Sequence, residues 1–99
     1  MKLNINLRNG IIVYDDFNIN PDIPLQDQIL ELDEDLLQIQ YDNNIIIDVG
    51  WYGEFALGNF TIYIIKDFDW DHPLYKKIVE LKNIATELQK AIDLVPIFK

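Results

Sequence analysis

The sequence predicts an α+β fold in which an antiparallel sheet of about five strands carries a long C-terminal helix. Several short segments are rich in β-branched and aromatic residues and are separated by turn residues, which predicts the strands. Apolar residues of the last quarter instead recur at intervals of three and four, which predicts the helix. The chain has 99 residues, of which 49% are hydrophobic. It can therefore bury one core, and we expect a single domain over residues 1–99.

The first two strands are predicted at residues 2–8 and 11–18. Apolar and polar residues alternate in the first segment, so its leucine and isoleucine side chains point to one side of an extended chain. Asn9 and Gly10 follow, and both residue types tolerate the positive φ of a type I′ turn. Residues 18–24 contain two prolines, which remove backbone donors, so this stretch is predicted to be a loop.

A short helix is predicted at residues 24–33. The apolar residues from Leu25 to Leu36 follow a helical spacing, and Pro24 suits the first turn of a helix, where its missing N–H costs nothing. The alternative is a strand over residues 29–32 with a turn at 33–35, because Leu30 and Leu32 also alternate with a glutamate.

The next strands are predicted at residues 37–41, 45–52 and 60–65. The first two are separated by an Asp-Asn-Asn turn at 42–44, which favours a hairpin. Two glycines in residues 53–59 indicate a flexible connection into the third strand.

A long amphipathic helix is the clearest prediction, because apolar residues over 74–95 keep a helical spacing. Asp71 can cap its start, Pro73 fits its first turn, and Pro96 is expected to end it. The stripe could serve as a coiled-coil seam, but it spans only about three heptads and follows several strands. We therefore expect the helix to pack on the sheet.

The acidic residues are unevenly distributed along the chain. The formal net charge is −9, and neither Lys nor Arg occurs between Arg8 and Lys66. The acids of this stretch are Asp15, Asp16, Asp22, Asp27, Glu31, Asp33, Glu34, Asp35, Asp42, Asp48 and Glu54. Such a field repels nucleic acid and anionic membranes and attracts a basic protein. The charge therefore predicts a basic partner, and the alternative is that it serves solubility alone.

The chain contains no cysteine, which excludes disulfides and thiolate metal sites and fits a reducing compartment. No apolar run is long enough to span a bilayer, and residues 1–8 lack the apolar run of a signal peptide. We therefore expect a soluble cytoplasmic protein that binds neither nucleic acid nor membrane.

No set of residues in the sequence fits catalysis. His72 is the only histidine and no serine is present, so neither a two-histidine metal motif nor a Ser-His nucleophile can be built. Asp67, Asp69 and Asp71 have the spacing of the first half of a calcium loop, but His72 stands where that loop needs glycine. We therefore expect no enzyme activity, no metal and no cofactor.

Two tryptophan-containing clusters stand out, at residues 48–55 and 66–73. Each mixes large aromatic side chains with acids, and aromatic rings give a large contact area with little entropy to lose. This mixture is typical of interface anchors. The alternative is that Trp51 and Trp70 are core residues.

These clusters carry a resemblance. Asp-Val-Gly-Trp-Tyr at 48–52, Gly-Asn-Phe at 58–60 and Lys-Asp-Phe-Asp-Trp-Asp-His-Pro-Leu at 66–74 resemble small immunity proteins of bacterial polymorphic-toxin and contact-dependent growth inhibition systems. The resemblance covers about a third of the chain. It implies a cytoplasmic protein that neutralises a cognate toxin, often a nuclease, by covering its active site or blocking its substrate. A nuclease is basic around its cleft, which agrees with the charge of this chain.

We therefore expect the chain to bind a basic, nuclease-like toxin. The candidate partner-binding residues are Asp33, Glu34, Asp35, Asp48, Trp51, Tyr52, Glu54, Asp69 and Trp70. One alternative is a DNA mimic that inhibits a nuclease or a DNA-binding protein, with acids spaced like phosphates. Others are a small structural subunit that pairs through a strand edge or the last helix, and a carboxylate-dependent enzyme with converging acids in a pocket.

Overall fold

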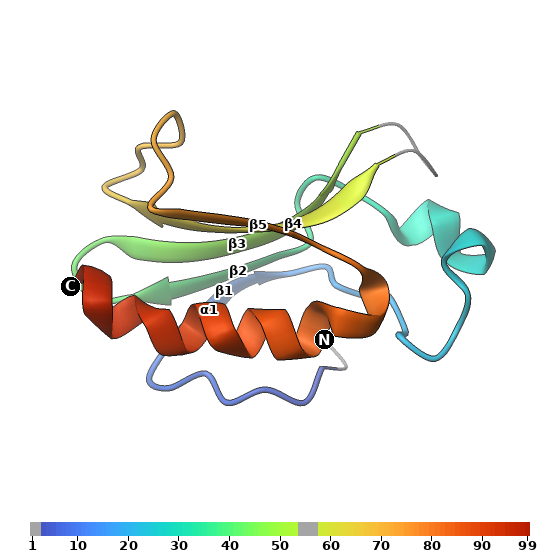
Figure 1. Cartoon of the computed structure of the whole chain (residues 1–99), viewed down its shortest axis with the longest axis horizontal. Helices are drawn as coiled ribbons and strands as arrows, with labels where there is room; N and C mark the ends of the chain where they lie inside the picture. Colours follow the sequence, from blue (N-terminus) through green and yellow to red (C-terminus); the bar gives the residue numbers. More distant parts are fainter. Residues whose placement is uncertain (1–2, 54–57) are drawn as a thin grey trace.

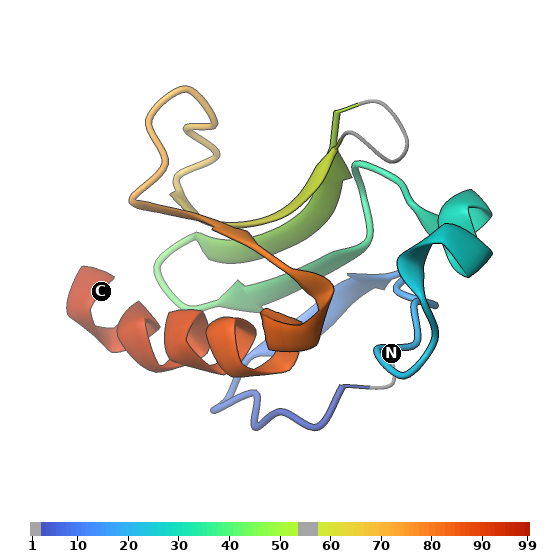
Figure 2. The same cartoon turned by 45° about the vertical axis from the view of Figure 1, so that its right-hand side comes forward.

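The fold is α+β, as predicted from the sequence. The computed structural model describes residues 3–53 and 58–99 of the chain. One antiparallel sheet has the strand order β1-β2-β3-β4-β5, which is also the order of the strands in the sequence. A C-terminal helix, α1, lies along one side of this sheet (Figures 1 and 2). The elements are β1 Ile11–Asp15, η1 Leu25–Glu31, β2 Leu37–Tyr41, β3 Ile45–Tyr52, β4 Asn59–Lys66, β5 Tyr75–Val79, η3 Leu81–Asn83 and α1 Ile84–Phe98.

The core lies between the sheet and α1. Alternate side chains of a strand point to opposite faces of a sheet, and Ile47, Val49 and Trp51 of β3 join the hydrophobic core. The buried stripe of α1, which includes Leu88 and Ile92, packs in the same core. The prediction that the last helix packs on the sheet is thus confirmed.

The predicted strand at residues 2–8 is wrong over residues 3–8, and residue 2 lies outside the described residues. A tight turn does form, but positive φ falls on Arg8 (50°) and Asn9 (71°), one position earlier than the predicted Asn9-Gly10 pair. Residues 3–8 then bond to α1 instead of β1. The backbone N–H of Asn6 donates to Oε1 of Gln89 over 2.7 Å, and Nε2 of Gln89 donates back to the Asn6 carbonyl over 3.1 Å. A glutamine amide can satisfy both backbone groups of one residue, so it takes the place of a strand partner.

β1 also ends earlier than predicted, at Asp15 instead of residue 18. Downstream, Phe17 and Ile19 are buried in the core, although they belong to no strand. Phe17 lies with its ring centroid 6.4 Å from that of Phe60. The apolar residues of this stretch therefore anchor a loop to the core.

The helical prediction at residues 24–33 is confirmed in part, because η1 is a 3-10 helix with non-helical angles at Gln28. The Gln28 side chain explains the break. Its Oε1 accepts from the Asn20 N–H over 2.9 Å, and its Nε2 donates to the carbonyls of Asn20 and Ile23. No residue of η1 is buried, so packing does not enforce a regular α-helix.

The strands predicted at 37–41, 45–52 and 60–65 are confirmed as β2, β3 and β4. The helix predicted to begin near Asp71 is wrong in its first part, where β5 pairs with β4. Without β5, the outer backbone groups of β4 would lack partners, and this tertiary pairing overrides the helical spacing of the sequence.

The end of the last helix also differs from the prediction. Pro96 lies inside α1, which continues to Phe98. A proline removes one backbone donor, but it stands in the last turn, where one lost bond does not break the helix. The Nζ of Lys66 donates to the Phe98 carbonyl over 3.1 Å, and a cation at this end also complements the helix dipole.

Candidate binding face

A row of mostly polar side chains crosses the sheet on the face turned away from α1. Direct cross-strand pairing places one residue from each of the five strands in this row. We call it the cross-strand row, and its members are Tyr14, Gln38, Asp48, Tyr63 and Lys76. Figure 1 shows α1 on the other side of the sheet. No described helix covers the row.

Asp48 is the buried centre of the row. Only 1% of its surface is exposed. Its Oδ1 accepts from Nε2 of Gln38 over 3.1 Å, and its Oδ2 accepts from the hydroxyl of Tyr52 over 2.9 Å. Burial raises the pKa of Asp48, and these two hydrogen bonds oppose that rise. Asp48 therefore orients its neighbours from within the sheet, and its carboxylate does not reach the surface to meet a partner.

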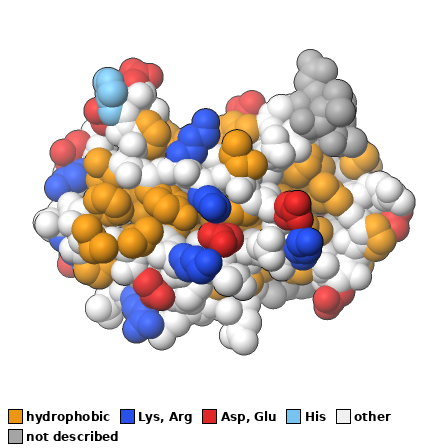
Figure 3. All heavy atoms as spheres, in the orientation of Figure 1, with side chains coloured by type: hydrophobic (Ala, Val, Ile, Leu, Met, Phe, Trp, Pro, Cys, Tyr) orange, Lys and Arg blue, Asp and Glu red, His pale blue; other side chains and the backbone are white. Residues whose placement is uncertain are grey.

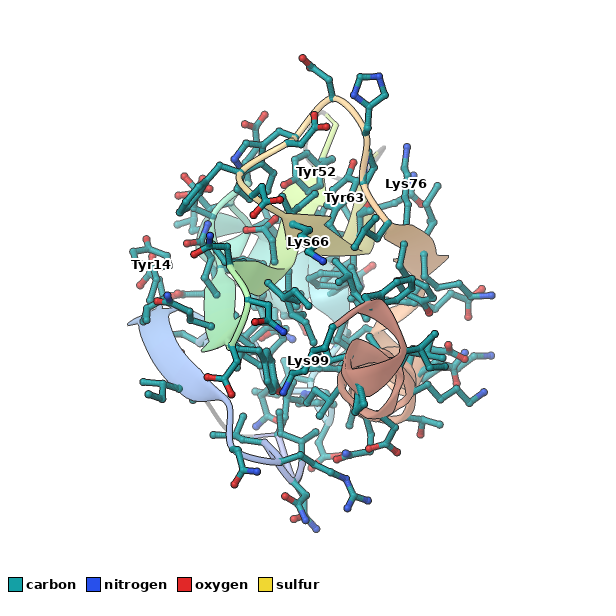
Figure 4. All side chains as sticks on the ribbon, turned by 90° about the vertical axis from the view of Figure 1, so that its left-hand side faces the viewer. Tyr14, Tyr52, Tyr63, Lys66, Lys76 and Lys99 are labelled. Carbon is teal, nitrogen blue, oxygen red and sulfur yellow. The ribbon has the colours of Figure 1, made fainter. Side chains whose placement is uncertain are left out.

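Two tyrosine rings extend the network toward β5. The rings of Tyr52 and Tyr63 meet edge to face, with centroids 5.6 Å apart and an interplanar angle of 87°. The Nζ of Lys76 lies 5.8 Å from the Tyr63 centroid, within cation–π range. Figure 4 shows Tyr52 and Tyr63 as neighbours, with Lys76 beyond them. Burial, and then the charge of Asp48, raises the pKa of the Tyr52 phenol, which therefore stays a neutral donor.

The acidic segment 33–35 leads into β2 and runs alongside the end of β3, beside this network. The N–H of Trp51 donates to the Asp33 carbonyl over 2.7 Å, which ties the segment to β3. A side chain at Gly50 would collide with the Glu34 carbonyl, so only glycine allows this close approach. The side chains of Asp33, Glu34 and Asp35 are exposed. The sheet thus presents three carboxylates at the end of β3.

One of these acids, Asp35, lies beside Tyr14. A hollow of about 380 Å³ is lined by Val13, Tyr14, Asp35 and Gln38. Partial desolvation raises the pKa of Tyr14, and the nearby carboxylates of Asp16, Asp33 and Asp35 raise it further. In Figure 4, Tyr14 stands at the β1 side of the sheet. This corner therefore combines a half-exposed aromatic ring with several acids.

The side of the molecule in Figure 3, which shows α1 and β5, has a different charge pattern. There Lys and Arg side chains lie among Asp and Glu side chains. Lys82 pairs with Glu80, and Lys90 pairs with Glu87, each over 3.3 Å. The uneven charge of the sequence therefore becomes an uneven surface.

The structure separates the other predicted binding residues. Trp51 is buried in the core with its ring against Phe60, at 4.8 Å between centroids, so the alternative prediction of a core residue is confirmed for it. Asp69 and Trp70 lie in the loop between β4 and β5, and Trp70 is 46% exposed. Glu54 lies outside the described residues.

That loop stands at the opposite end of β3 from segment 33–35. The N–H of Asp67 donates to the Asn44 carbonyl, just before β3 begins. Within the loop, Nδ1 of His72 lies 3.1 Å from Oδ1 of Asp69 on an exposed surface. The exposed predicted residues thus form two groups at opposite ends of β3. Asp48 and Tyr52 lie on the face of β3 turned away from α1, and Trp51 lies on the core face.

Sequence reasoning missed Tyr14, Gln38, Tyr63 and Lys76. The sequence does mark these four residues, because each alternates with core residues along its strand and so occupies the opposite face of the sheet. This alternation groups the four residues into one row only when the register between the strands is known, and the sequence does not supply that register.

Several classes of site are not found in the described residues. Across residues 3–53 and 58–99, no group of three His, Asp or Glu side chains is placed to hold a metal ion. Among the same residues, no helix combines the length and the apolar character that crossing a membrane requires. Comparison of the chain with protein-family models, curated proteins and solved structures found no match.

Proposed function

We propose that this chain is an immunity protein that binds and neutralises a basic toxin, with a nuclease as the favoured class, in the cytoplasm. It acts by binding and not by catalysis. The observation that carries the proposal is the acidic corner, where Asp35 lines one hollow with Tyr14 and the neighbouring Asp33 and Glu34 are exposed, at the end of a row of polar and aromatic side chains that no described helix covers. The resemblance of residues 48–52, 58–60 and 66–74 to immunity proteins points the same way.

The acidic corner raises the rate of association with a basic partner. No Lys or Arg lies between Arg8 and Lys66 in the sequence, so the acids of segment 33–35 have no basic sequence neighbour to neutralise them. Carboxylates on one surface attract a basic protein over several ångströms and raise its association rate, most strongly at low salt. Nucleases are basic around their substrate cleft, so the corner is complementary to the surface that an inhibitor must cover.

The tyrosines supply the contact area. Tyr14, Tyr52 and Tyr63 belong to the face that no described helix covers, and they retain some exposure. Tyrosine rings bury a large area and have only two side-chain torsions to fix, which makes them frequent anchors of protein interfaces. Tyr52 is already held by Asp48 and Tyr63, so little further ordering is needed on binding.

A DNA mimic is the alternative that shares this charge. It requires acids spaced like phosphates along an elongated surface. Here Asp35 lines one hollow with Tyr14, Asp33 and Glu34 adjoin it in the sequence, and the chain spans 39 × 28 × 19 Å. A compact patch beside aromatic side chains favours a protein surface as the target.

The first test is capture of the partner from a lysate of the source cells at low and at high salt, with mass spectrometry of the bound proteins. We expect one basic polypeptide in equal stoichiometry, and its expression should arrest growth unless this chain is expressed with it. Capture of a DNA-binding regulator without toxicity would favour the DNA mimic instead.

The second test separates the acidic corner from net charge. The triple variant Asp33→Asn, Glu34→Gln, Asp35→Asn should slow association with the captured toxin about tenfold at low salt, with little change in dissociation. The matched control replaces Asp42, Asp67 and Asp71 by Asn, which removes the same charge at the opposite end of β3 and leaves the candidate residue Asp69 in place. Equal slowing by both variants would show that net charge alone acts, and an unchanged rate in the first would refute the role of segment 33–35.

A further inference from the structure

The hollow on the β1 side of the sheet has walls of three chemical kinds. It is lined by Val13, Tyr14, Asp35 and Gln38, and its volume is about 380 Å³. Val13 is 51% exposed and Tyr14 is 42% exposed, and they supply an aliphatic side chain and an aromatic ring. Asp35 supplies a carboxylate, and Gln38 supplies a side-chain amide. Pockets of about 300–1,000 Å³ bind small ligands, so this hollow is large enough for one long side chain.

The amide of Gln38 is oriented by the buried carboxylate of Asp48. Its Nε2 donates to Oδ1 of Asp48, and the hydroxyl of Tyr52 donates to Oδ2. An ionised carboxylate only accepts hydrogen bonds, so it selects the nitrogen of the amide and not the oxygen. The Oε1 of Gln38 is left as an acceptor, and no hydrogen bond among the described residues uses it. The hollow therefore offers a neutral oxygen in addition to a carboxylate.

The backbone on both sides of Asp35 is bonded to β3. The N–H of Trp51 donates to the Asp33 carbonyl over 2.7 Å, and the N–H of Leu36 donates to the Val49 carbonyl over 3.1 Å. The acid in the wall of the hollow is thus carried by a backbone that is already held in place. A positioned acceptor loses little conformational freedom when a ligand binds.

The charge of Asp35 is available to a cation from outside. Among residues 3–53 and 58–99, no Lys, Arg or His side chain forms an ion pair with it. Lys76 is the cation of the cross-strand row, and it is four strand spacings from Tyr14, or roughly 19 Å. Figure 4 shows these two residues at opposite sides of the sheet. Physiological salt screens exposed charges beyond about 8 Å, so Lys76 does not neutralise this corner.

We propose that the hollow binds the side chain of one arginine of the basic partner. The inference rests on the proposed function, and it names the chemical group that the acidic corner recognises. A guanidinium is planar and has five donors, so it can stack on the Tyr14 ring and donate within its own plane to Asp35 and Gln38. Its aliphatic stem can lie against Val13. A lysine ammonium is a compact, strongly hydrated charge and gains less from a ring and an amide oxygen.

A second copy of this chain does not supply such an arginine. Arg8 is the only arginine in the sequence, and its Nε donates to Oδ1 of Asp93 over 2.9 Å. Each copy also has a net charge of −9, and like charges across an interface oppose association. A basic protein meets neither obstacle, so charge complementarity selects it as the occupant.

The test is an amide NMR titration of the isotope-labelled full chain at low salt with three blocked tripeptides. Their central residues are arginine, lysine and citrulline, which has the shape of arginine without its charge. We expect the arginine peptide to shift the backbone signals of Val13, Tyr14 and Asp35 and the side-chain amide signals of Gln38. The lysine peptide should bind at least about threefold more weakly, and the citrulline peptide about tenfold more weakly.

Two substitutions of exposed residues test the walls of the hollow. Asp35→Asn keeps the shape of the side chain and should weaken binding of the arginine peptide about three- to tenfold. Tyr14→Leu keeps an apolar side chain without the ring face, and it should reduce the preference for arginine over lysine. The matched control Asp42→Asn removes the same charge in the turn at the other end of β2 and should leave binding unchanged. Unshifted core signals in each variant show that it is folded.

The proposal is overturned if the arginine peptide does not bind, binds no better than the lysine peptide, or shifts signals centred outside the hollow. An equal loss in Asp42→Asn and Asp35→Asn would also overturn it, because net charge alone would then act. A captured toxin whose affinity is unchanged by Asp35→Asn and Tyr14→Leu would refute this inference and leave the proposed function standing. Selective binding of the arginine peptide with no toxin in the capture would do the reverse.

Discussion

Replacing Tyr52 by phenylalanine tests the buried carboxylate at the centre of the cross-strand row. The change removes one hydroxyl and keeps the ring that meets Tyr63 edge to face. Asp48 then loses the hydrogen bond that its Oδ2 accepts over 2.9 Å and retains only the bond from Gln38. A carboxylate that is 1% exposed cannot replace the lost donor with bulk water.

The size of the effect follows from the charge of the acceptor. A hydrogen bond to a charged group stabilises a protein by about 1.5–3 kcal/mol, and one between neutral groups by about 0.5–1.5 kcal/mol. Tyr52 retains partial exposure, so we expect a loss of about 1.5–2 kcal/mol in the free energy of unfolding at pH 7. For a chain of this length, such a loss lowers the thermal midpoint by roughly 10 °C.

The effect should depend on pH. The pKa of Asp48 is raised in the folded state, mainly by burial. A pKa that is raised in the folded state means that the native protein binds the proton more tightly than the unfolded chain does. The contribution of Asp48 to the free energy of unfolding therefore increases as the pH falls from the folded-state pKa toward the unfolded-state pKa. Removing the Tyr52 hydroxyl removes one influence that lowers this pKa. The loss in the free energy of unfolding is therefore largest at pH 7. It becomes smaller as the pH falls and Asp48 takes up its proton.

Urea unfolding of both proteins at pH 7 and at about pH 5, followed by tryptophan fluorescence, measures this difference. Trp51 is buried against Phe60 and reports loss of the core. The matched control is Tyr63→Phe, which removes the hydroxyl of the neighbouring ring but no hydrogen bond to Asp48. A loss that is the same at both pH values, or the same in the control, would refute the role given to Asp48.

Further substitutions test the packing around the site. Gly50→Ala should destabilise the fold by about 1–3 kcal/mol in urea unfolding, because the new methyl group meets the Glu34 carbonyl. Trp51→Ala should cost about 3–5 kcal/mol by the same assay, because it empties a large core position; a loss below 1 kcal/mol would instead place Trp51 at the surface. Gln89→Ala should speed exchange of the Asn6 amide proton about five- to tenfold, since it removes that proton's acceptor; an unchanged exchange rate would show that another group protects it.

The central strands could be predicted because local and tertiary preferences agree there. Residues 45–52 combine β-branched and aromatic side chains, and they lie in the middle strand, where both faces are buried. At the two ends of the chain, these preferences disagree. Residues 75–79 share a helical apolar spacing with α1, but the open edge of β4 recruits them as β5. Residues 2–8 alternate like a strand, but no strand forms over residues 3–8, where the Gln89 side chain of α1 bonds the backbone of Asn6 instead.

The candidate site was predictable only in part. The acids of segment 33–35 follow directly from the charge pattern, and Tyr52 follows from its aromatic cluster. Asp48 was chosen for its charge, although the apolar run around it signals burial. The row that joins Tyr14 to Lys76 depends on four registers between strands. Such pairing is set by turns and by the core together, so a single sequence does not fix it.

The order of the strands also has a consequence for how the chain folds. Because the strands are adjacent in space in the same order as in the sequence, every sheet pairing can form between neighbouring segments as the chain condenses. Such local pairings close short loops and favour fast folding for a β-rich protein. The bonds from Asn6 and Arg8 to α1 are different, since they join residues 83 and 85 positions apart. We therefore expect the sheet to form first and the N-terminal segment to dock last, as a separate and slower step.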